Sequence, residues 1–287
     1  MVFGTFSSTL LTREAQAACP GTFSGRDCNG TSGGAVCSGS GASVTCDLGV
    51  SGDSSANAKF VSPTHTEFRA YGYEGDGEPF CCEITVDDGC SGQLSALTIY
   101  GTSSADVIDL NDTNPDPVLH LECFHAKVYG LEQDDTITGS NSTYNEDELH
   151  GDDDDDTIYG AIGADLIFGE AGVDDLHGGP DDDYIWGGSE TDYLYGDIGA
   201  DYLYGEGGDD FVKGGDGADH IYGDDNDDEI CGQWGDDVLD GGPDDDGVWG
   251  GPDSDTNSGG LGSSDYCEYP GDDITCENTI ETTVCPW

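Results

Sequence analysis

Apolar positions in the second half of the chain recur with a strict period of nine residues. Each unit begins with glycine, carries aspartate at its sixth position and an aliphatic residue at its eighth, and the first unit starts at Gly151. A glycine-rich hexapeptide favours a tight turn, and the polar–apolar–polar triplet that follows alternates as a short strand does. A fixed period of this length indicates a solenoid. The eighth positions are Ile158, Ile167, Leu176, Ile185, Leu194, Leu203, Val212, Ile221, Ile230, Leu239 and Val248, and Asn257 stands there in the last unit.

The triplets also predict how the units assemble. A three-residue strand has one inward side chain and cannot bury it alone, so a second strand must face it and two units make one coil. Successive coils then stack about 4.8 Å apart through parallel pairing, and nearly all parallel crossovers are right-handed. We therefore predict an all-β chain in which residues 151–258 form a right-handed parallel β-roll, a β-solenoid with two nonapeptides per coil.

The sixth-position aspartates predict a need for metal. In this fold the carboxylates of neighbouring coils, such as Asp183 and Asp201, come within a few ångström of each other. Two such charges at about 4 Å repel by roughly 4 kcal/mol at an effective dielectric constant of about 20. A divalent cation between them replaces repulsion with coordination, and carboxylate and carbonyl oxygens suit calcium. No row of histidine or cysteine favours zinc, so we expect multiple calcium ions and folding that depends on them.

The units resemble the nonapeptide Gly-Gly-x-Gly-x-Asp-x-U-x (U aliphatic) of the RTX, or haemolysin-type, calcium-binding repeat family. The resemblance is loose from residue 97 and tight over 151–258, and residues 214–222 match every position. At the fourth position Asp181, Glu190 and Asp244 replace glycine, which bears on the ligand geometry of single sites rather than on the fold. The resemblance implies calcium between the turns of adjacent coils. It implies as metal-site residues Asp135, Asp147, Asp156, Asp165, Asp174, Asp183, Asp192, Asp201, Asp210, Asp219, Asp228, Asp237, Asp246 and Asp255, with Gly160, Gly178, Gly196 and Gly214.

Twelve cysteines without the paired spacing of a zinc site indicate disulfides and an oxidising compartment. We expect a secreted protein, located outside the cell or at the cell surface. Residues 18–96 fit a small disulfide-rich β module, although the nine-residue spacing of the first four cysteines also fits an irregular start of the solenoid. Residues 97–150 are expected to be irregular repeats that cap the roll. Residues 259–287 are expected to be a disulfide-stapled C-terminal cap, in which Cys267 pairs with Cys231.

Two interpretations of residues 1–17 stay open. They are a signal-peptide remnant ending in the small-x-small triplet at residues 15–17, or the leader of a lipoprotein acylated at Cys19, which Gln16 disfavours. No stretch is long and apolar enough for membrane insertion.

The formal net charge of −56 argues against nucleic acid and acidic lipid as partners. So much acid is also typical of disorder, which is the expected state without calcium. The chain has no HExxH zinc-protease motif and no G-x-S-x-G nucleophile elbow. Its many aspartates are better explained as calcium ligands than as general acids and bases, so we predict that it is not an enzyme.

One outward face of the roll is predicted to be aromatic. One interpretation is that the rows of aromatic side chains simply favour strand formation and stack on one another. The other is that they form a contact surface, because such a patch is rarely left in water. The cover would be the N-terminal module, a second copy in self-association, or an extracellular sugar polymer. We predict a structural or adhesive role at the cell surface or in extracellular matrix; the alternative is a carbohydrate- or protein-binding module. The predicted binding face is Phe168, Tyr184, Trp186, Tyr202, Tyr204 and Tyr222.

Overall fold

The structure is a computed structural model of the 287-residue chain. It describes residues 36–40, 43–47, 56–64, 67–74, 79–85, 96–101, 106–110, 125–141, 146–261, 266–268, 273–275 and 278–280. Side chains are described for residues 99–101, 106–110, 126–141 and 146–261. All the regular elements in these ranges are strands. The described residues therefore contain no helix long and apolar enough to cross a membrane. The chain divides into two compact units, Met1–Asp153 and Asp154–Trp287.

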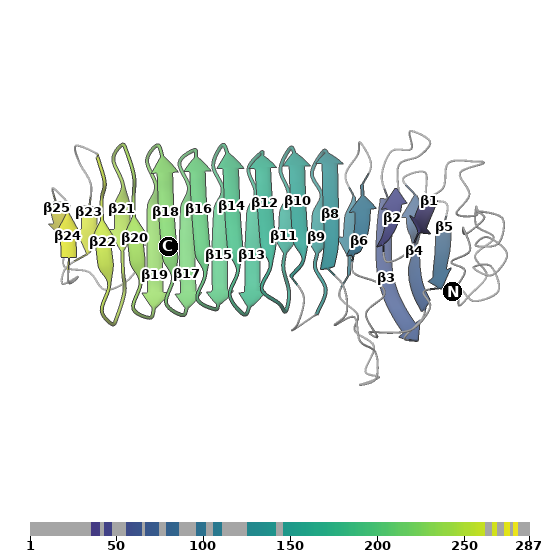
Figure 1. The fold of residues 1–287 in the computed structure, drawn as a ribbon. Helices are drawn as coiled ribbons and strands as arrows, with labels where there is room; N and C mark the ends of the chain where they lie inside the picture. Colours follow the sequence, from purple (N-terminus) through teal and green to yellow (C-terminus); the bar gives the residue numbers. More distant parts are fainter. Residues whose placement is uncertain are drawn as a thin grey trace. The chain divides into compact units, whose positions relative to one another are not determined.

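The second unit consists of two facing sheets of parallel strands (Figure 1). One sheet contains, in spatial order, β12 (Leu166–Ala171), β14 (Tyr184–Ser189), β16 (Tyr202–Gly207), β18 (His220–Asp225), β20 (Val238–Asp240), β22 (Thr256–Ser258) and β24 (Asp273–Thr275). The other contains β11 (Thr157–Tyr159), β13 (Asp175–Pro180), β15 (Tyr193–Ile198), β17 (Phe211–Asp216), β19 (Glu229–Trp234), β21 (Gly247–Trp249), β23 (Tyr266–Glu268) and β25 (Asn278–Ile280). Consecutive strands of the chain alternate between the sheets.

The register of the strands confirms the predicted coil of two nonapeptides. Ile185 pairs with Leu203, and Leu203 with Ile221, so each residue lies beside the one eighteen positions further on. Every eighth-position aliphatic side chain from Ile158 to Val248 is at most 1 % exposed, and together they form the core. The parallel β-solenoid follows, because a single inward side chain per triplet leaves no other way to bury this row. Its right-handed sense stays a prediction.

The first unit also has two sheets. One contains β1 (Val36–Ser40), β2 (Ser43–Asp47), β6 (Ala96–Tyr100), β8 (His125–Glu132) and β10 (Glu148–Asp153); the other contains β5 (Pro79–Thr85), β4 (Glu67–Glu74), β3 (Ala56–Thr64), β7 (Val107–Asp109) and β9 (Thr136–Thr138). The early pairs β1–β2, β3–β4 and β4–β5 are antiparallel, whereas β2–β6 and β3–β7 are parallel. Strands of the predicted N-terminal module therefore share sheets with the first irregular repeats of this unit.

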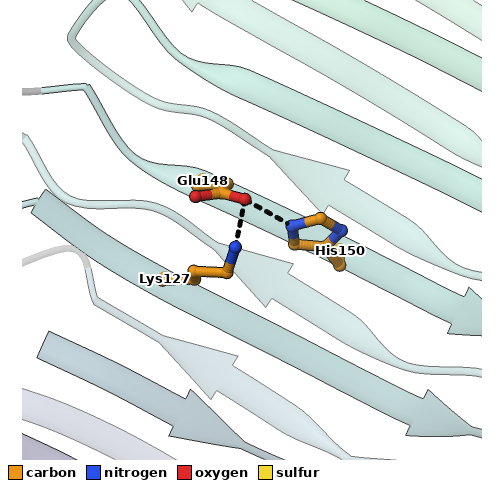
Figure 2. Close-up of polar contacts among 3 residues, drawn as sticks. All are labelled: Lys127, Glu148 and His150. Carbon is orange, nitrogen blue, oxygen red and sulfur yellow. Dashed lines mark hydrogen bonds and ion pairs between the residues drawn. The ribbon is translucent and has the colours of Figure 1, made fainter.

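Two strands of the first unit are linked by a polar cluster (Figure 2). Glu148 on β10 pairs in register with Lys127 on β8 and accepts a hydrogen bond from its ammonium group. This bond raises the pKa of Lys127 above its ordinary value. Glu148 also lies 3.0 Å from Nε2 of His150, so one carboxylate connects side chains of both strands.

The predicted disulfides fall largely outside the described residues. Cys231 is buried on β19 and is not a free thiol. The side chains of Cys267 and of the cysteines before residue 99 are not among those described. The pairing of Cys231 with Cys267, the N-terminal disulfide module and the stapled cap stay predictions, as does the leader at residues 1–17.

Candidate metal centres

The turns between strands depend on left-handed backbone at the second position of each unit and at the fourth position of most units. Glycine supplies it in some units, for example Gly215 with φ +121° and Gly208 with φ +146°. Where glycine is replaced, the conformation is kept: φ is +86° at Asp181 and +74° at Glu190. Non-glycine residues rarely adopt this region. The departures from the nonapeptide pattern therefore leave the turn geometry unchanged and store some strain in it.

Each sixth-position aspartate is held by the coil before it. The backbone N–H of Asp183 donates to Oδ1 of Asp201 at 2.8 Å, and the N–H of Asp201 donates to Oδ1 of Asp219 at 2.9 Å. The same bond joins residues i and i+18 throughout the second unit, over 2.7–3.1 Å. One carboxylate oxygen of each residue is thus fixed, and the other is aimed by that constraint.

The second carboxylate oxygen is buried and accepts no hydrogen bond. This holds for Oδ2 of Asp174, Asp183, Asp192, Asp201, Asp210, Asp219, Asp228 and Asp237. Buried polar atoms nearly always have a partner, and leaving one unsatisfied costs about 1–3 kcal/mol, more for a charged group. Because these oxygens repeat in the same register along the roll, we expect each to bind the same kind of ligand.

First-position glycines open the space that these oxygens face. A β-carbon built on Gly196 would lie 2.5 Å from Oδ2 of Asp201 and 2.5 Å from the carbonyl oxygen of Gly214. A carboxylate oxygen of one coil and a main-chain carbonyl of the next therefore converge on this position. Any larger residue would fill the space between them, which explains why glycine begins every unit.

Burial shifts the titration of the row. Loss of solvation, assisted by the neighbouring carboxylates Asp165 and Asp201, raises the pKa of Asp183 to about 9. The same causes raise the pKa of Asp192, Asp201 and Asp228 to about 8, in each case against the lowering effect of the backbone N–H bond. The row therefore cannot carry its full negative charge near neutral pH without a counter-ion.

The donor set fits a hard divalent cation. Among the residues with described side chains, no three His, Cys, Asp or Glu side chains come together as a metal-binding group. The oxygens that converge at a first-position glycine such as Gly196 are a carboxylate oxygen and a main-chain carbonyl oxygen. Such all-oxygen sets with adjustable ligand number are those of calcium.

Comparison with known families agrees with this geometry. A family model described as RTX calcium-binding nonapeptide repeat (4 copies) matches residues 142–176, 168–203, 177–212, 204–239 and 232–264. Residues 142–264 are a run of RTX repeats. No curated protein matches the chain. RTX nonapeptide repeats bind calcium, so the family and the donor set point to the same ion.

All the aspartates expected to bind metal in the RTX repeats and before them are buried, from Asp135 to Asp255. Asp147 differs from the rest, because Oδ1 accepts the N–H of Ala126 at 3.1 Å and Oδ2 accepts that of Ser140 at 2.6 Å. Both of its oxygens are thus engaged by backbone, which makes it the weakest candidate ligand of the set.

Sequence reasoning missed some equivalent positions. Asp106 is 2 % exposed, and its carboxylate faces Gly101 and the carbonyl of Gly130 in the same arrangement as in the RTX repeats. The signal was present as an imperfect unit beginning at Gly101. First-position glycines on the other edge, such as Gly187 and Gly205, make the same cradle as the four that were predicted.

The predicted aromatic face is assembled as two ladders on β12, β14, β16 and β18. Stacked pairs are Phe168–Trp186 at 4.6 Å, Trp186–Tyr204 at 5.6 Å, Tyr204–Tyr222 at 5.1 Å and Tyr184–Tyr202 at 4.7 Å between ring centroids. Their planes lie within 8° of parallel. The rings therefore cover one another's faces and turn their edges outward. The opposite sheet carries ladders too, through His177 and Tyr195, which the sequence reading did not emphasise.

Proposed function

We propose that this chain is a secreted calcium-binding β-roll protein with a structural or adhesive role at the cell surface or in an extracellular matrix. The observation that carries the proposal is the row of buried aspartate Oδ2 atoms without hydrogen-bond partners, each facing a glycine cradle. Such a row is unfavourable alone and favourable around cations, so calcium becomes part of the folded structure rather than an accessory to it.

In this proposal the aspartates from Asp174 to Asp237 hold calcium together with first-position carbonyls, such as those of Gly178, Gly196 and Gly214. Calcium supplies the positive charge that the row lacks. The chain's own contribution is to fix one carboxylate oxygen by the hydrogen bond between coils, so that the other is already aimed before an ion arrives. Several ions are expected, because the arrangement repeats at every coil.

The structural role is supported by the construction of the roll. Its core is one row of aliphatic side chains, and its outer faces are stiffened by stacked rings. The RTX β-roll is a structural fold, and we propose that this chain has no catalytic activity of its own. The cysteine content and the acidic charge support secretion.

Self-association through the aromatic face is the contact that this role would use. Between Leu166 and Tyr222 the positions that flank the inward aliphatic residues of this sheet hold no acidic residue, although Glu170 and Glu206 lie further along β12 and β16. A second copy that contacts only these flanking positions would bury no carboxylate. Tyr184 is 38 % exposed and lies at its centre.

A calcium titration followed by far-ultraviolet circular dichroism tests the proposal. The chelator-treated full chain should lack strand signal and gain it cooperatively as calcium is added, whereas the same concentrations of magnesium should produce little change, since magnesium dehydrates reluctantly. A metal-free chain that keeps its strand signal and compact size would contradict the proposed role of calcium.

A further inference from the structure

A hollow of about 430 Å³ lies on the outer surface of the sheet that contains β13, β15, β17 and β19. It opens where glycine occupies the second position of two alternate coils. Gly179 and Gly215 pair in register with Asp197 from either side, so its side chain has no side-chain neighbour along that row. On the opposite sheet the corresponding row is Glu170, Gly188, Glu206 and Asp224, so a single glycine interrupts it there. The hollow therefore results from the positions of Gly179 and Gly215 in the sequence of this sheet.

The lining combines apolar surface with donors and acceptors. Pro180 and Ile198 form one side, and Ile198 is 57 % exposed. Tyr195 and Lys213 form the other, with the Lys213 ammonium 5.6 Å from the centre of the Tyr195 ring. Lys213 is the one lysine or arginine in the sequence after Lys127. A cation at this place in so acidic a chain is an exception.

Polar groups complete the wall. The carboxylates of Asp197 and Asp216 offer acceptors, the amide of Gln233 offers both a donor and an acceptor, and Lys213 offers donors. Because neighbouring strands lie about 4.8 Å apart, these groups are spaced closely along the hollow. Closely spaced donors and acceptors beside an apolar wall match a ligand with several adjacent hydroxyl groups and an apolar ring face.

We infer that this hollow is a binding site for a neutral sugar, of one or two residues of a polysaccharide or glycan. Its volume is within the range of small-molecule sites. A net charge of −56 repels anionic ligands before they reach Lys213, which selects against uronic acids and sulfated sugars. The inference deepens the proposed adhesive function and rests on it, because calcium must hold β13 to β19 in register for the hollow to exist.

The aromatic face of the other sheet is a poorer sugar site. Its rings stack on one another with centroids 4.6–5.6 Å apart along the ladder from Phe168 to Tyr222, so a pyranose ring cannot lie flat on them. Sugar recognition by this chain therefore requires a hollow rather than that surface.

The test uses the calcium-loaded full chain on an array of neutral, uronic-acid and sulfated oligosaccharides, followed by calorimetric titration with the best neutral disaccharide. We expect neutral sugars to bind. Lys213→Met and Gln233→Leu, which keep side-chain size but remove hydrogen-bonding groups, should each weaken binding by about tenfold. The control Glu229→Gln changes a charge on the same sheet outside the hollow and should leave affinity within about twofold.

Three outcomes would overturn the inference: no sugar bound by a chain shown to fold on calcium, binding of anionic sugars alone, or lining variants that bind as tightly as the parent. Circular dichroism of the same samples separates this from the proposed function. A chain that folds on calcium but binds no sugar contradicts only the inference of a sugar site. A chain that binds neutral sugars while needing no calcium contradicts the calcium proposal instead.

Discussion

The backbone N–H of Asp183 donates to Oδ1 of Asp201, eighteen residues further along the chain, at 2.8 Å. Both residues are fully buried, and the Oδ2 atom of each accepts no hydrogen bond. The hydrogen bond to Oδ1 thus fixes the orientation of the Asp201 carboxylate and leaves its buried Oδ2 atom without a hydrogen-bond donor. Its repetition along the roll makes the stability of each coil depend on its neighbours and on bound cations.

The first prediction separates the buried row from ordinary acidic residues. Asp201→Asn keeps an acceptor for the N–H of Asp183 but removes the negative charge and the second carboxylate oxygen, so the calcium concentration at the folding midpoint should rise several-fold. Asp182→Asn is a matched control, because Oδ1 of this exposed residue also accepts a backbone N–H from the next coil, that of Ala200, at 2.9 Å. Its midpoint should stay within about twofold of the parent. Equal shifts in the two variants, measured by circular dichroism, would remove the special role of the buried row.

The second prediction concerns pH. Burial raises the pKa of Asp183 to about 9 and that of Asp192 to about 8, from the ordinary aspartate value of 3.8. A folded-state pKa above the unfolded value favours folding at low pH, and that contribution is lost as pH rises through the folded-state value. The metal-free chain should therefore be more structured near pH 5 than near pH 9.

With calcium present the trend should reverse. Binding requires ionised carboxylates, so it releases protons, and the calcium midpoint should fall as pH rises from about 6 to about 9. Circular dichroism at several pH values, with and without calcium, checks both trends. A metal-free chain whose strand content is independent of pH would show that these carboxyls do not titrate as buried groups.

The third prediction uses two glycines on neighbouring coils. Gly188 has φ +123°, and a β-carbon there would overlap the carbonyl oxygen of Glu170. Gly188→Ala should therefore lower the free energy of unfolding by about 2 kcal/mol or more. At Gly207 the nearest atom to an added β-carbon is the Gly188 carbonyl oxygen, 3.8 Å away, so Gly207→Ala should be neutral or slightly stabilising. Thermal unfolding at saturating calcium measures both, and similar melting temperatures would refute the close packing of the turns.

The fourth prediction concerns association. Trp186→Ser combined with Tyr204→Ser should preserve calcium-driven folding and abolish self-association, because it removes the centre of one ladder. Tyr193→Ser combined with Phe211→Ser removes a stacked pair from the other sheet and serves as the control. Light scattering at saturating calcium gives the molecular mass of each. If the parent itself is monomeric at saturating calcium, the aromatic face is not a self-association surface.

The sequence by itself determined the repeat, the coil of two units, the inward aliphatic row and the inward aspartates. It could do so because a period of nine with one apolar residue per triplet leaves a single way to bury that row, from Ile158 to Val248. It also indicated the aromatic rows, since outward positions alternate with inward ones along a strand.

The tertiary structure decided what depends on neighbouring coils. Stacking at a spacing of eighteen residues leaves Oδ2 of Asp201 without a hydrogen-bond partner, while both oxygens of Asp147 accept backbone N–H groups. It keeps the turn at Glu190 left-handed without glycine, and it places Gly179 and Gly215 on either side of Asp197 to open a hollow. These features were beyond sequence reasoning for one reason: a repeat pattern fixes which way each side chain points, whereas its partners lie one coil away and are set by packing.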